Sequence, residues 1–422
     1  MQQLVDERRL MARLLGNRSF AHLSMANRST SEPGEILAFL EDLSAAVRPA
    51  AVQELDRLSA AFPAMPRRPD GTVAPWNYAY YSSAAQASSA NISDYLTLGN
   101  CMYGLNEITR ELFGAELRVA PVTSTERWHP DVQKLEVVHE TEGSMGIIYL
   151  DLFDRHGKFQ NPANFSLQFS TKCNGWKTPR LAVVCNFRSS SSAPYLLSYG
   201  QTVTLFHEFG HALNNIFSRT EYHHNAGVRS PVDFVETPST LMEFFLKDYR
   251  VVSRFARHYL TGEPIPRDHF RAFLRGHGLF TAIDTQQEIA LSVFDLVLHG
   301  EKPVDVGEQY HALLRRYSLV PPVPDTWWYA RFGHVSGYAA SFYTYLLCKA
   351  VSTNLWEGFF KQDPLSREVG DVYRREVLQR GGERDPHAML QAMHDQCAPG
   401  SPRVTRLPSV QVFADSLRAL SA

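Results

Sequence analysis

The stretch Phe206-His207-Glu208-Phe209-Gly210-His211 constrains this 422-residue chain more than any other. Histidines four residues apart lie on one face of an α-helix, about one turn apart, where both imidazoles can reach a single metal ion. Glu208 projects beside them and can serve as a general base. A buried helix with two hydrogen-bonded histidines is the structural alternative. The spacing therefore predicts a helix over 202–217 that carries two ligands of a metal site.

A candidate third ligand follows in the sequence, as a catalytic zinc ion needs three protein ligands and one open position for water. Glu236 stands near the start of a second predicted helix, 240–245, after a turn-rich segment. The positive end of that helix also suits a carboxylate without any metal, which is the alternative explanation. Glu243 lies seven residues further along the same face and can hydrogen-bond a ligating histidine, and Asp233 can serve likewise.

These residues together carry a family resemblance. His207-Glu208-x-x-His211, followed by Asp-Phe-Val-Glu-Thr-Pro-Ser at 233–239, resembles the thimet-oligopeptidase family of zinc metallopeptidases. The resemblance implies that His207, His211 and Glu236 bind one Zn²⁺ ion per chain and that Glu208 is the general base. It also implies a mainly α-helical, zincin-like fold with a small β-sheet beside the zinc-binding helix.

Three further stretches, at 16–25, 243–259 and 372–382, are similar to the mitochondrial intermediate peptidase branch of that family. The resemblance implies a metalloendopeptidase that removes an N-terminal octapeptide from imported mitochondrial precursors. Its substrate is then a peptide or an unfolded precursor N-terminus, and its location is the mitochondrial matrix. We expect this chain to lack the long N-terminal helical half of family members. We also expect no transit peptide of its own, because acidic residues lie among the first arginines.

A second group of candidate residues lies at 331–347, where a glycine-containing loop continues into a predicted helix. Tyr338 and Tyr345 are seven residues apart and share a helix face if that helix begins early enough. Aromatic stripes of this kind usually belong to a hydrophobic core. The resemblance implies instead that His334, Tyr338 and Tyr345 donate hydrogen bonds to the substrate carbonyl and the tetrahedral intermediate.

The region before the metal-binding helix consists of short apolar runs separated by turn residues. Five runs predict β-strands, at 117–122, 135–139, 146–153, 165–169 and 181–187. A small sheet there can bind an extended substrate along its edge, or it can simply pack against the helix. Between the two ligand helices, Gly227 suggests backbone that can approach a substrate. His224 is either a substrate contact or a solvated loop residue.

Helical periodicity dominates the rest of the chain. Apolar residues recur at helical spacing from 34 to 62, and we expect Pro49 to break this run into two helices. From Asp268 to the end, the pattern is again almost wholly helical. The chain is therefore expected to form three consecutive regions. These are a helical region forming part of a channel wall (1–115), a catalytic core with the sheet and both ligand helices (116–260), and a C-terminal helical region with the tyrosine-rich loop (261–422).

Composition excludes several classes of protein. The formal net charge of -2 and the pI near 6.8 argue against a nucleic-acid or membrane-surface partner. Five widely spaced cysteines without a C-x-x-C pair indicate neither a disulfide framework nor a cysteine zinc site, and they fit a reducing compartment. Apolar stretches fall short of the roughly 18 residues that span a membrane. We expect a monomer without membrane insertion.

Two alternative functions stay open. A general oligopeptidase that cleaves short free peptides would use the same site chemistry. The other alternative is a truncated product that binds zinc or peptide without turnover, because half of the channel wall is expected to be absent. Exposed apolar surface on the isolated protein would favour this second alternative.

Overall fold

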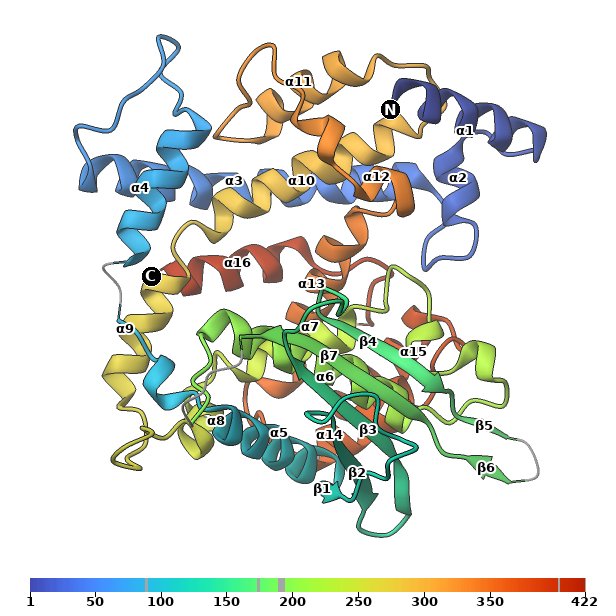
Figure 1. Ribbon diagram of the computed structural model, residues 1–422. Coiled ribbons are helices and arrows are strands. Elements are labelled where there is room, and N and C mark those ends of the chain that lie inside the picture. Colours follow the sequence, from blue (N-terminus) through green and yellow to red (C-terminus); the bar gives the residue numbers. More distant parts are fainter. Residues whose placement is uncertain (88–89, 173–174, 189–193, 401–402, 422) are drawn as a thin grey trace. The chain divides into compact units, whose positions relative to one another are not determined.

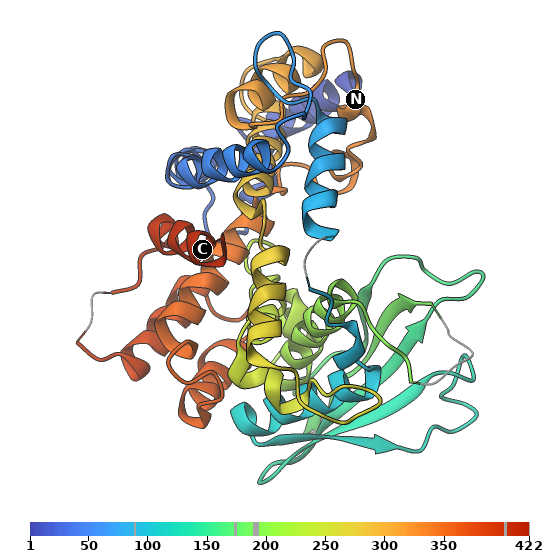
Figure 2. The ribbon, with the colours of Figure 1, turned by 90° about the vertical axis from the view of Figure 1, so that its left-hand side faces the viewer.

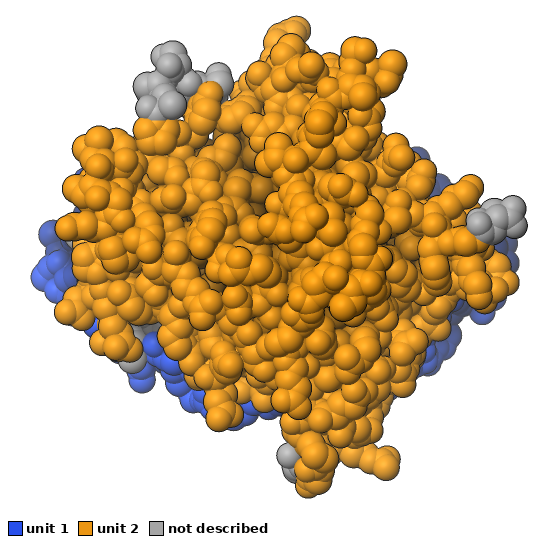
Figure 3. Space-filling view, turned by 90° about the horizontal axis from the view of Figure 1, so that it is seen from below, with its two compact units in different colours: residues 1–90, 272–350, 407–422 blue, residues 91–271, 351–406 orange. Residues whose placement is uncertain are grey.

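The computed structural model describes residues 1–87, 90–172, 175–188, 194–400 and 403–421. The chain forms two compact units, each assembled from segments that are distant in sequence. Unit 1 comprises residues 1–90, 272–350 and 407–422, and unit 2 comprises residues 91–271 and 351–406 (Figure 3). The three consecutive regions expected from the sequence follow a different division, because helices from both ends of the chain contribute to unit 1. None of the described helices is both long and apolar enough to span a membrane.

Unit 1 is built from helices (Figure 1). They are α1 (Gln2–Leu14), α2 (Phe20–Met25), α3 (Pro33–Ala61), α4 (Pro75–Ala87), α10 (Thr281–Leu298), α11 (Val306–Tyr317), η4 (Trp328–Arg331), α12 (His334–Gly337) and α16 (Val410–Ser421). The long helices α3 and α10 pack side by side, and α11 and α16 contact this pair (Figures 1 and 2). Leu40 and Leu43 of α3 and Phe294 of α10 belong to the hydrophobic core between them.

The helix α3 runs through Pro49 without a break, which corrects the expectation of two separate helices. Proline lacks the N–H that would bond the carbonyl four residues earlier. Here Pro49 and Ala45, the residue with that carbonyl, are both exposed, so water can hydrate the free oxygen. The opposite face of the helix, with Val47 and Ala51, is buried in the core of unit 1. Packing of that face holds the helix together where local propensity disfavours it.

Unit 2 combines helices with a five-stranded mixed sheet in the order β1-β2-β3-β7-β4. β3 and β7 pair in parallel, and the other neighbours are antiparallel. The strands are β1 (Ala115–Ala120), β2 (Gln133–His139), β3 (Gly143–Phe153), β4 (Ala163–Gln168) and β7 (Arg180–Phe187), and β5 (Thr171–Lys172) pairs separately with β6 (Trp176–Lys177). The five strands predicted from the sequence are thus all present, with ends shifted by a few residues.

The helices of unit 2 include those that pack against this sheet and those that carry the candidate site. They are η1 (Ser93–Tyr95), α5 (Leu98–Phe113), α6 (Tyr199–Phe217), η2 (His223–Asn225), η3 (Gly227–Arg229), α7 (Thr237–Phe245), α8 (Tyr249–Phe255), η5 (Trp356–Phe360), α14 (Arg367–Tyr373), η6 (Arg374–Leu378) and α15 (Pro386–Cys397). α6 packs against β7, β3 and β4 (Figure 1). Two more helices, α9 (Arg267–His277) and α13 (Tyr343–Leu355), contain the points where the chain passes from one unit to the other.

Candidate active site

The helix α6 places the two motif histidines. It begins with a reciprocal cap, in which Ser198 Oγ accepts the N–H of Gln201 and the Gln201 side chain accepts the N–H of Ser198. Such a cap satisfies two backbone donors at the start of a helix. The buried side of α6 includes Leu205, Phe209, Ala212, Leu213 and Ile216. With that side packed, His207 and His211 are presented together on the remaining surface of α6.

Gly210 allows α6 and α7 to approach each other closely. A Cβ at this position would lie 2.7 Å from the carbonyl oxygen of Pro238 and 2.9 Å from the backbone nitrogen of Ser239. Both neighbours are backbone atoms near the start of α7, so neither can rotate away. The missing side chain therefore lets Glu236, the residue directly before α7, reach the imidazoles of α6.

His207, His211 and Glu236 converge on one point. Oε2 of Glu236 lies 3.2 Å from Nε2 of His207 and 3.0 Å from Nε2 of His211. One potential ligand atom from each residue lies within 4.8 Å of the other two. Two imidazole nitrogens and one carboxylate oxygen match the ligand set of catalytic zinc sites, with room for a fourth ligand. The three residues therefore fit a divalent metal ion.

Two neighbouring side chains orient these groups. Oε1 of Glu243 lies 2.8 Å from Nδ1 of His207, which leaves Nε2 as the free ligand atom. Ser239 Oγ donates to Oε2 of Glu236 at 3.0 Å and to its backbone oxygen at 2.9 Å. Sequence reasoning missed Ser239, although its place three residues after Glu236 on a helix was a usable signal. Asp233 is buried in the turn before α7, and its supporting role stays a prediction.

The cluster strongly perturbs the ionisation of its members. Burial alone would lower the pKa of His207, but hydrogen bonds to Glu236 and Glu243 and their charges raise it to about 10. Burial would raise the pKa of Glu236, yet its bonds to His207 and His211 hold that pKa well below the usual range. These shifts favour a positive charge on His207 beside the negative carboxylate of Glu236. A divalent cation would take the place of that positive charge.

Glu208 is suited to proton transfer beside this cluster. Its side chain is buried, and its Oε2 has no hydrogen-bond partner among the described residues. Burial raises the pKa of the carboxyl group, with the charges of His211 and His207 opposing that shift. A carboxylate whose pKa is moved towards neutrality is a more effective general base.

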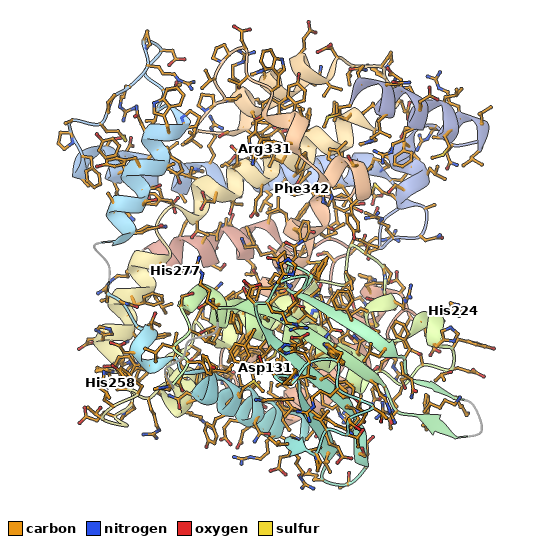
Figure 4. The ribbon with its side chains drawn as sticks, in the orientation of Figure 1. Asp131, His224, His258, His277, Arg331 and Phe342 are labelled. Atoms are coloured by element: carbon orange, nitrogen blue, oxygen red, sulfur yellow. The ribbon has the colours of Figure 1, made fainter. Side chains whose placement is uncertain are left out.

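Gly227 and His224 are the predicted substrate contacts of the excursion between α6 and α7. Gly227 is buried with φ +54°, and its N–H donates to Ser218 Oγ at 2.9 Å. A Cβ there would lie 2.8 Å from Cα of Asn215 in α6, so packing against that helix already accounts for the glycine. His224 is exposed and lies against His223, with ring centroids 3.9 Å apart (Figure 4). Neither belongs to the metal-ligand cluster, and their substrate roles stay predictions.

His334, Tyr338 and Tyr345 lie in unit 1, where they form an aromatic group. The ring of His334 lies 5.6 Å from that of Tyr338, 5.9 Å from that of Tyr345 and 5.0 Å from that of Phe342. Tyr338 is 67% and Tyr345 49% exposed, so neither belongs to the core. The condition for a shared helix face is not met, because α12 ends before Tyr338 and α13 begins only at Tyr343.

A mainly helical fold that brings an H-E-x-x-H helix against a glutamate-bearing helix is that of the zincin-like metallopeptidases. The chain belongs to peptidase family M3, whose model matches residues 1–401. Membership in this metallopeptidase family implies a metal cofactor, and the cluster of His207, His211 and Glu236 is available to hold it.

Relatives and solved structures are consistent with this assignment. The mitochondrial intermediate peptidase of Pongo abelii is 36% identical over 99% of this chain, and that of Arabidopsis thaliana is 34% identical over 92%. The chain spans 58% and 57% of the lengths of these relatives. The fold resembles a solved structure of PZ peptidase A with an inhibitor (TM-score 0.62, 16% identity, 99% of this chain and 64% of that one). It also resembles a putative oligoendopeptidase F (TM-score 0.59, 16% identity, 99% and 62%).

Proposed function

We propose that this chain carries the catalytic site of a zinc-dependent metalloendopeptidase, with His207, His211 and Glu236 as the ligands of one zinc ion. The observation that carries the proposal is the convergence of both Nε2 atoms on one carboxylate oxygen. Bound zinc would polarise the scissile carbonyl and lower the pKa of a bound water. All three proposed ligands come from one chain, so a monomer would already contain the whole metal site.

Glu208 is the proposed general base. Its carboxylate takes a proton from the attacking water and passes it to the leaving amine nitrogen as the peptide bond breaks. Burial favours this cycle because a raised pKa allows the group both to accept and to release a proton near neutral pH.

Substrate positioning is assigned to two parts of the chain. The edge strand β4 pairs with β7 on one side and contacts α6, so its other side can bind an extended peptide through main-chain hydrogen bonds. We assign hydrogen-bond donation to the substrate oxyanion to Tyr345, with Tyr338 or His334. Family membership and the accessible phenol groups support this assignment. Losing one such donor typically lowers turnover by about two to three powers of ten.

The proposed substrates are precursor proteins from which an N-terminal octapeptide is removed in the mitochondrial matrix. The support is the similarity to mitochondrial intermediate peptidases over nearly the whole chain. A general oligopeptidase and a chain that binds zinc or peptide without turnover are the competing outcomes. The first would cleave short free peptides as well as a precursor peptide. The second would bind zinc and cleave neither.

The test is a comparison of the purified chain with Glu208→Gln. We measure zinc content by elemental analysis and cleavage of an octapeptide-bearing precursor peptide alongside generic short peptides. The wild-type chain is expected to cleave the precursor peptide preferentially. Glu208→Gln should keep its zinc and lose about 10²- to 10⁴-fold in turnover, the usual contribution of a general base.

Glu263→Gln is the matched control, because it makes the same chemical change at an exposed position of unit 2. It should cleave at the wild-type rate. Cleavage by Glu208→Gln at the control rate would contradict the mechanism. Bound zinc without cleavage by the wild-type chain would favour the non-catalytic alternative.

A further inference from the structure

Asp295 is a charged side chain enclosed within unit 1. It lies on α10, and its exposed fraction is 0%. A buried carboxylate is strongly disfavoured unless hydrogen bonds replace the lost water. Its partners therefore indicate what its charge does in this fold.

Three of these partners are consecutive backbone N–H groups. Oδ1 accepts the N–H of Ala340 at 3.0 Å, and Oδ2 accepts those of Ser341 at 2.8 Å and Phe342 at 3.0 Å. Ala340 has φ +55°, a left-handed conformation that is uncommon for a residue with a side chain. The carboxylate compensates for this strain by satisfying all three donors. It also fixes the start of α13, the helix that carries Tyr345.

A fourth partner extends the network to the other side of Tyr338. Nδ1 of His299 lies 3.2 Å from Oδ1 of Asp295, and its Nε2 lies 3.4 Å from Nη1 of Arg8. Arg8 donates to the carbonyl oxygen of Ser336 at 2.7 Å and to that of Val335. These carbonyls belong to α12, the short helix that begins with His334.

We propose that Asp295, His299 and Arg8 form a clamp that positions the segment carrying His334, Tyr338 and Tyr345 for catalysis. Arg8 holds the segment before Tyr338, and Asp295 holds it after Tyr338. Asp295 is thus a positioning residue that acts through the aromatic donors. The inference rests on the proposed function, because those donors are assigned their role there.

The chemistry of the clamp requires a carboxylate. Burial would raise the pKa of Asp295, but His299 and the N–H groups of Phe342 and Ala340 keep it below the usual range, so the group is ionised at neutral pH. An ionised carboxylate only accepts hydrogen bonds, which suits the donors around it. Asparagine would keep one accepting oxygen and turn an NH₂ group towards a backbone N–H. Asp295→Asn therefore leaves at least one N–H of 340–342 unsatisfied.

The test uses the full chain with Asp295→Asn and the matched control Glu54→Gln. Glu54 is also buried in unit 1, and its Oε2 accepts the N–H groups of Ala282 and Ile283 at 3.0 Å. The two changes remove the same kind of capping charge, but Glu54 caps the start of α10 rather than the segment with the aromatic donors. Asp295 lies thirteen positions further along α10 than Ala282, about 20 Å at 1.5 Å per residue.

We expect Asp295→Asn to lower kcat by about 10- to 100-fold with little change in KM, because the donors act mainly in the transition state. Amide hydrogen exchange at 340–342 should become faster. Glu54→Gln should lower the thermal midpoint while retaining kcat and the exchange rate at 340–342. Combining Asp295→Asn with Tyr345→Phe should cost much less than the product of the two single effects.

Three results would overturn the clamp: unchanged exchange at 340–342 in Asp295→Asn, a kcat equal to that of Glu54→Gln, or fully additive effects with Tyr345→Phe. If Asp295→Asn does not fold, Arg8→Lys tests the clamp in its place. Lysine keeps the positive charge but cannot donate to the carbonyl oxygens of Val335 and Ser336 at the same time, as arginine does. Amide hydrogen exchange over 334–338 must therefore become faster, and kcat must fall. A wild-type kcat for Tyr345→Phe would instead contradict the role proposed for that tyrosine, while the exchange data still decide the clamp.

Discussion

At the scale of single residues, assembly of the candidate metal site depends on atoms that take no part in the proposed chemistry. Gly210 matters because it has no side chain, and Ser239 matters because its hydroxyl orients Glu236. Glu243 fixes which nitrogen of His207 is free. The candidate ligands are thus held by neighbours whose contribution is steric or orientational, as is usual for metal centres.

Gly210→Ala should separate α6 from α7 at the point where their backbones meet. The added methyl group cannot be accommodated next to the backbone of Pro238 and Ser239, so we expect a loss of about 1–3 kcal/mol in the free energy of unfolding. Glu236 should also move away from both histidines. Zinc affinity, measured by competition with a chromogenic chelator, should fall by at least about tenfold, the lower range for disturbed ligand positioning.

Gly200→Ala is the control for this prediction. Gly200 lies in the first turn of the same helix, and a methyl group added there would have Ser198 Oγ, at 4.0 Å, as its nearest neighbour beyond the adjacent backbone. Alanine should fit at this position and leave zinc affinity unchanged. If Gly200→Ala and Gly210→Ala had equal zinc affinities, the position of Glu236 would not depend on close packing at Gly210.

At the scale of secondary structure, long-range packing overrides local preference in two elements. α3 remains one helix through Pro49 because its other face is buried against the core of unit 1. Between α12 and α13 the chain is not helical. The buried carboxylate of Asp295 on α10 stabilises this break, in which Ala340 has a left-handed conformation. Hydrophobic periodicity indicates neither outcome.

Pro49→Ala should stabilise the protein. The substitution restores the N–H that bonds the carbonyl of Ala45, at an exposed position where no packing is lost. A helix-interior proline costs about 3 kcal/mol relative to alanine in model helices. We expect a gain of about 1–3 kcal/mol in the free energy of unfolding, measured by urea denaturation.

Pro33→Ala provides the comparison within the same helix. Pro33 occupies the first turn, where a backbone N–H has no acceptor within the helix, so alanine regains no hydrogen bond. No gain in stability is expected there. If Pro49→Ala were neutral or destabilising, the helix would have to depend on the distortion that proline introduces.

At the scale of the whole molecule, the chain crosses between two units four times. Unit 1 contains both ends of the described chain, while the metal-ligand cluster belongs entirely to unit 2. Consecutive segments of sequence therefore do not correspond to the two compact units. The proposed metal ligands are therefore held by the packing of unit 2, whereas the proposed aromatic donors are held by the packing of unit 1.

Zinc binding should therefore stabilise the two units unequally. A ligand that binds only the folded state stabilises it by about 2.7 kcal/mol at a free concentration 100 times its Kd. We expect zinc to slow amide exchange in α6 and α7 of unit 2 more than in α3 of unit 1. Adding a chelator should reverse this difference. Equal protection of α3 and α6 would show instead that both units open only in one global transition.

Local sequence patterns account for much of the fold and for the choice of candidate ligands. Short apolar runs between turn residues located the five strands, and four-residue spacing placed His207 and His211 on one helix face. Both patterns are visible because periodicity depends on neighbours in the chain. Glu236 and Glu243 were predicted for a related reason, because the roles proposed for them depend on their positions at and along one helix.

Only the tertiary structure decided the rest. Three features join residues that are far apart in the chain. They are the close approach that requires glycine at 210, the four crossings of the chain between units, and the hydrogen bonds of Asp295 to 340–342. Core packing likewise settles the continuity of α3, and the contacts of Asp295 settle the separation of Tyr338 from the helix of Tyr345. The sequence by itself determined which side chains can bind a metal and which segments are helices or strands. Packing determined where those segments meet, because excluded volume and buried hydrogen bonds depend on partners that no local pattern identifies.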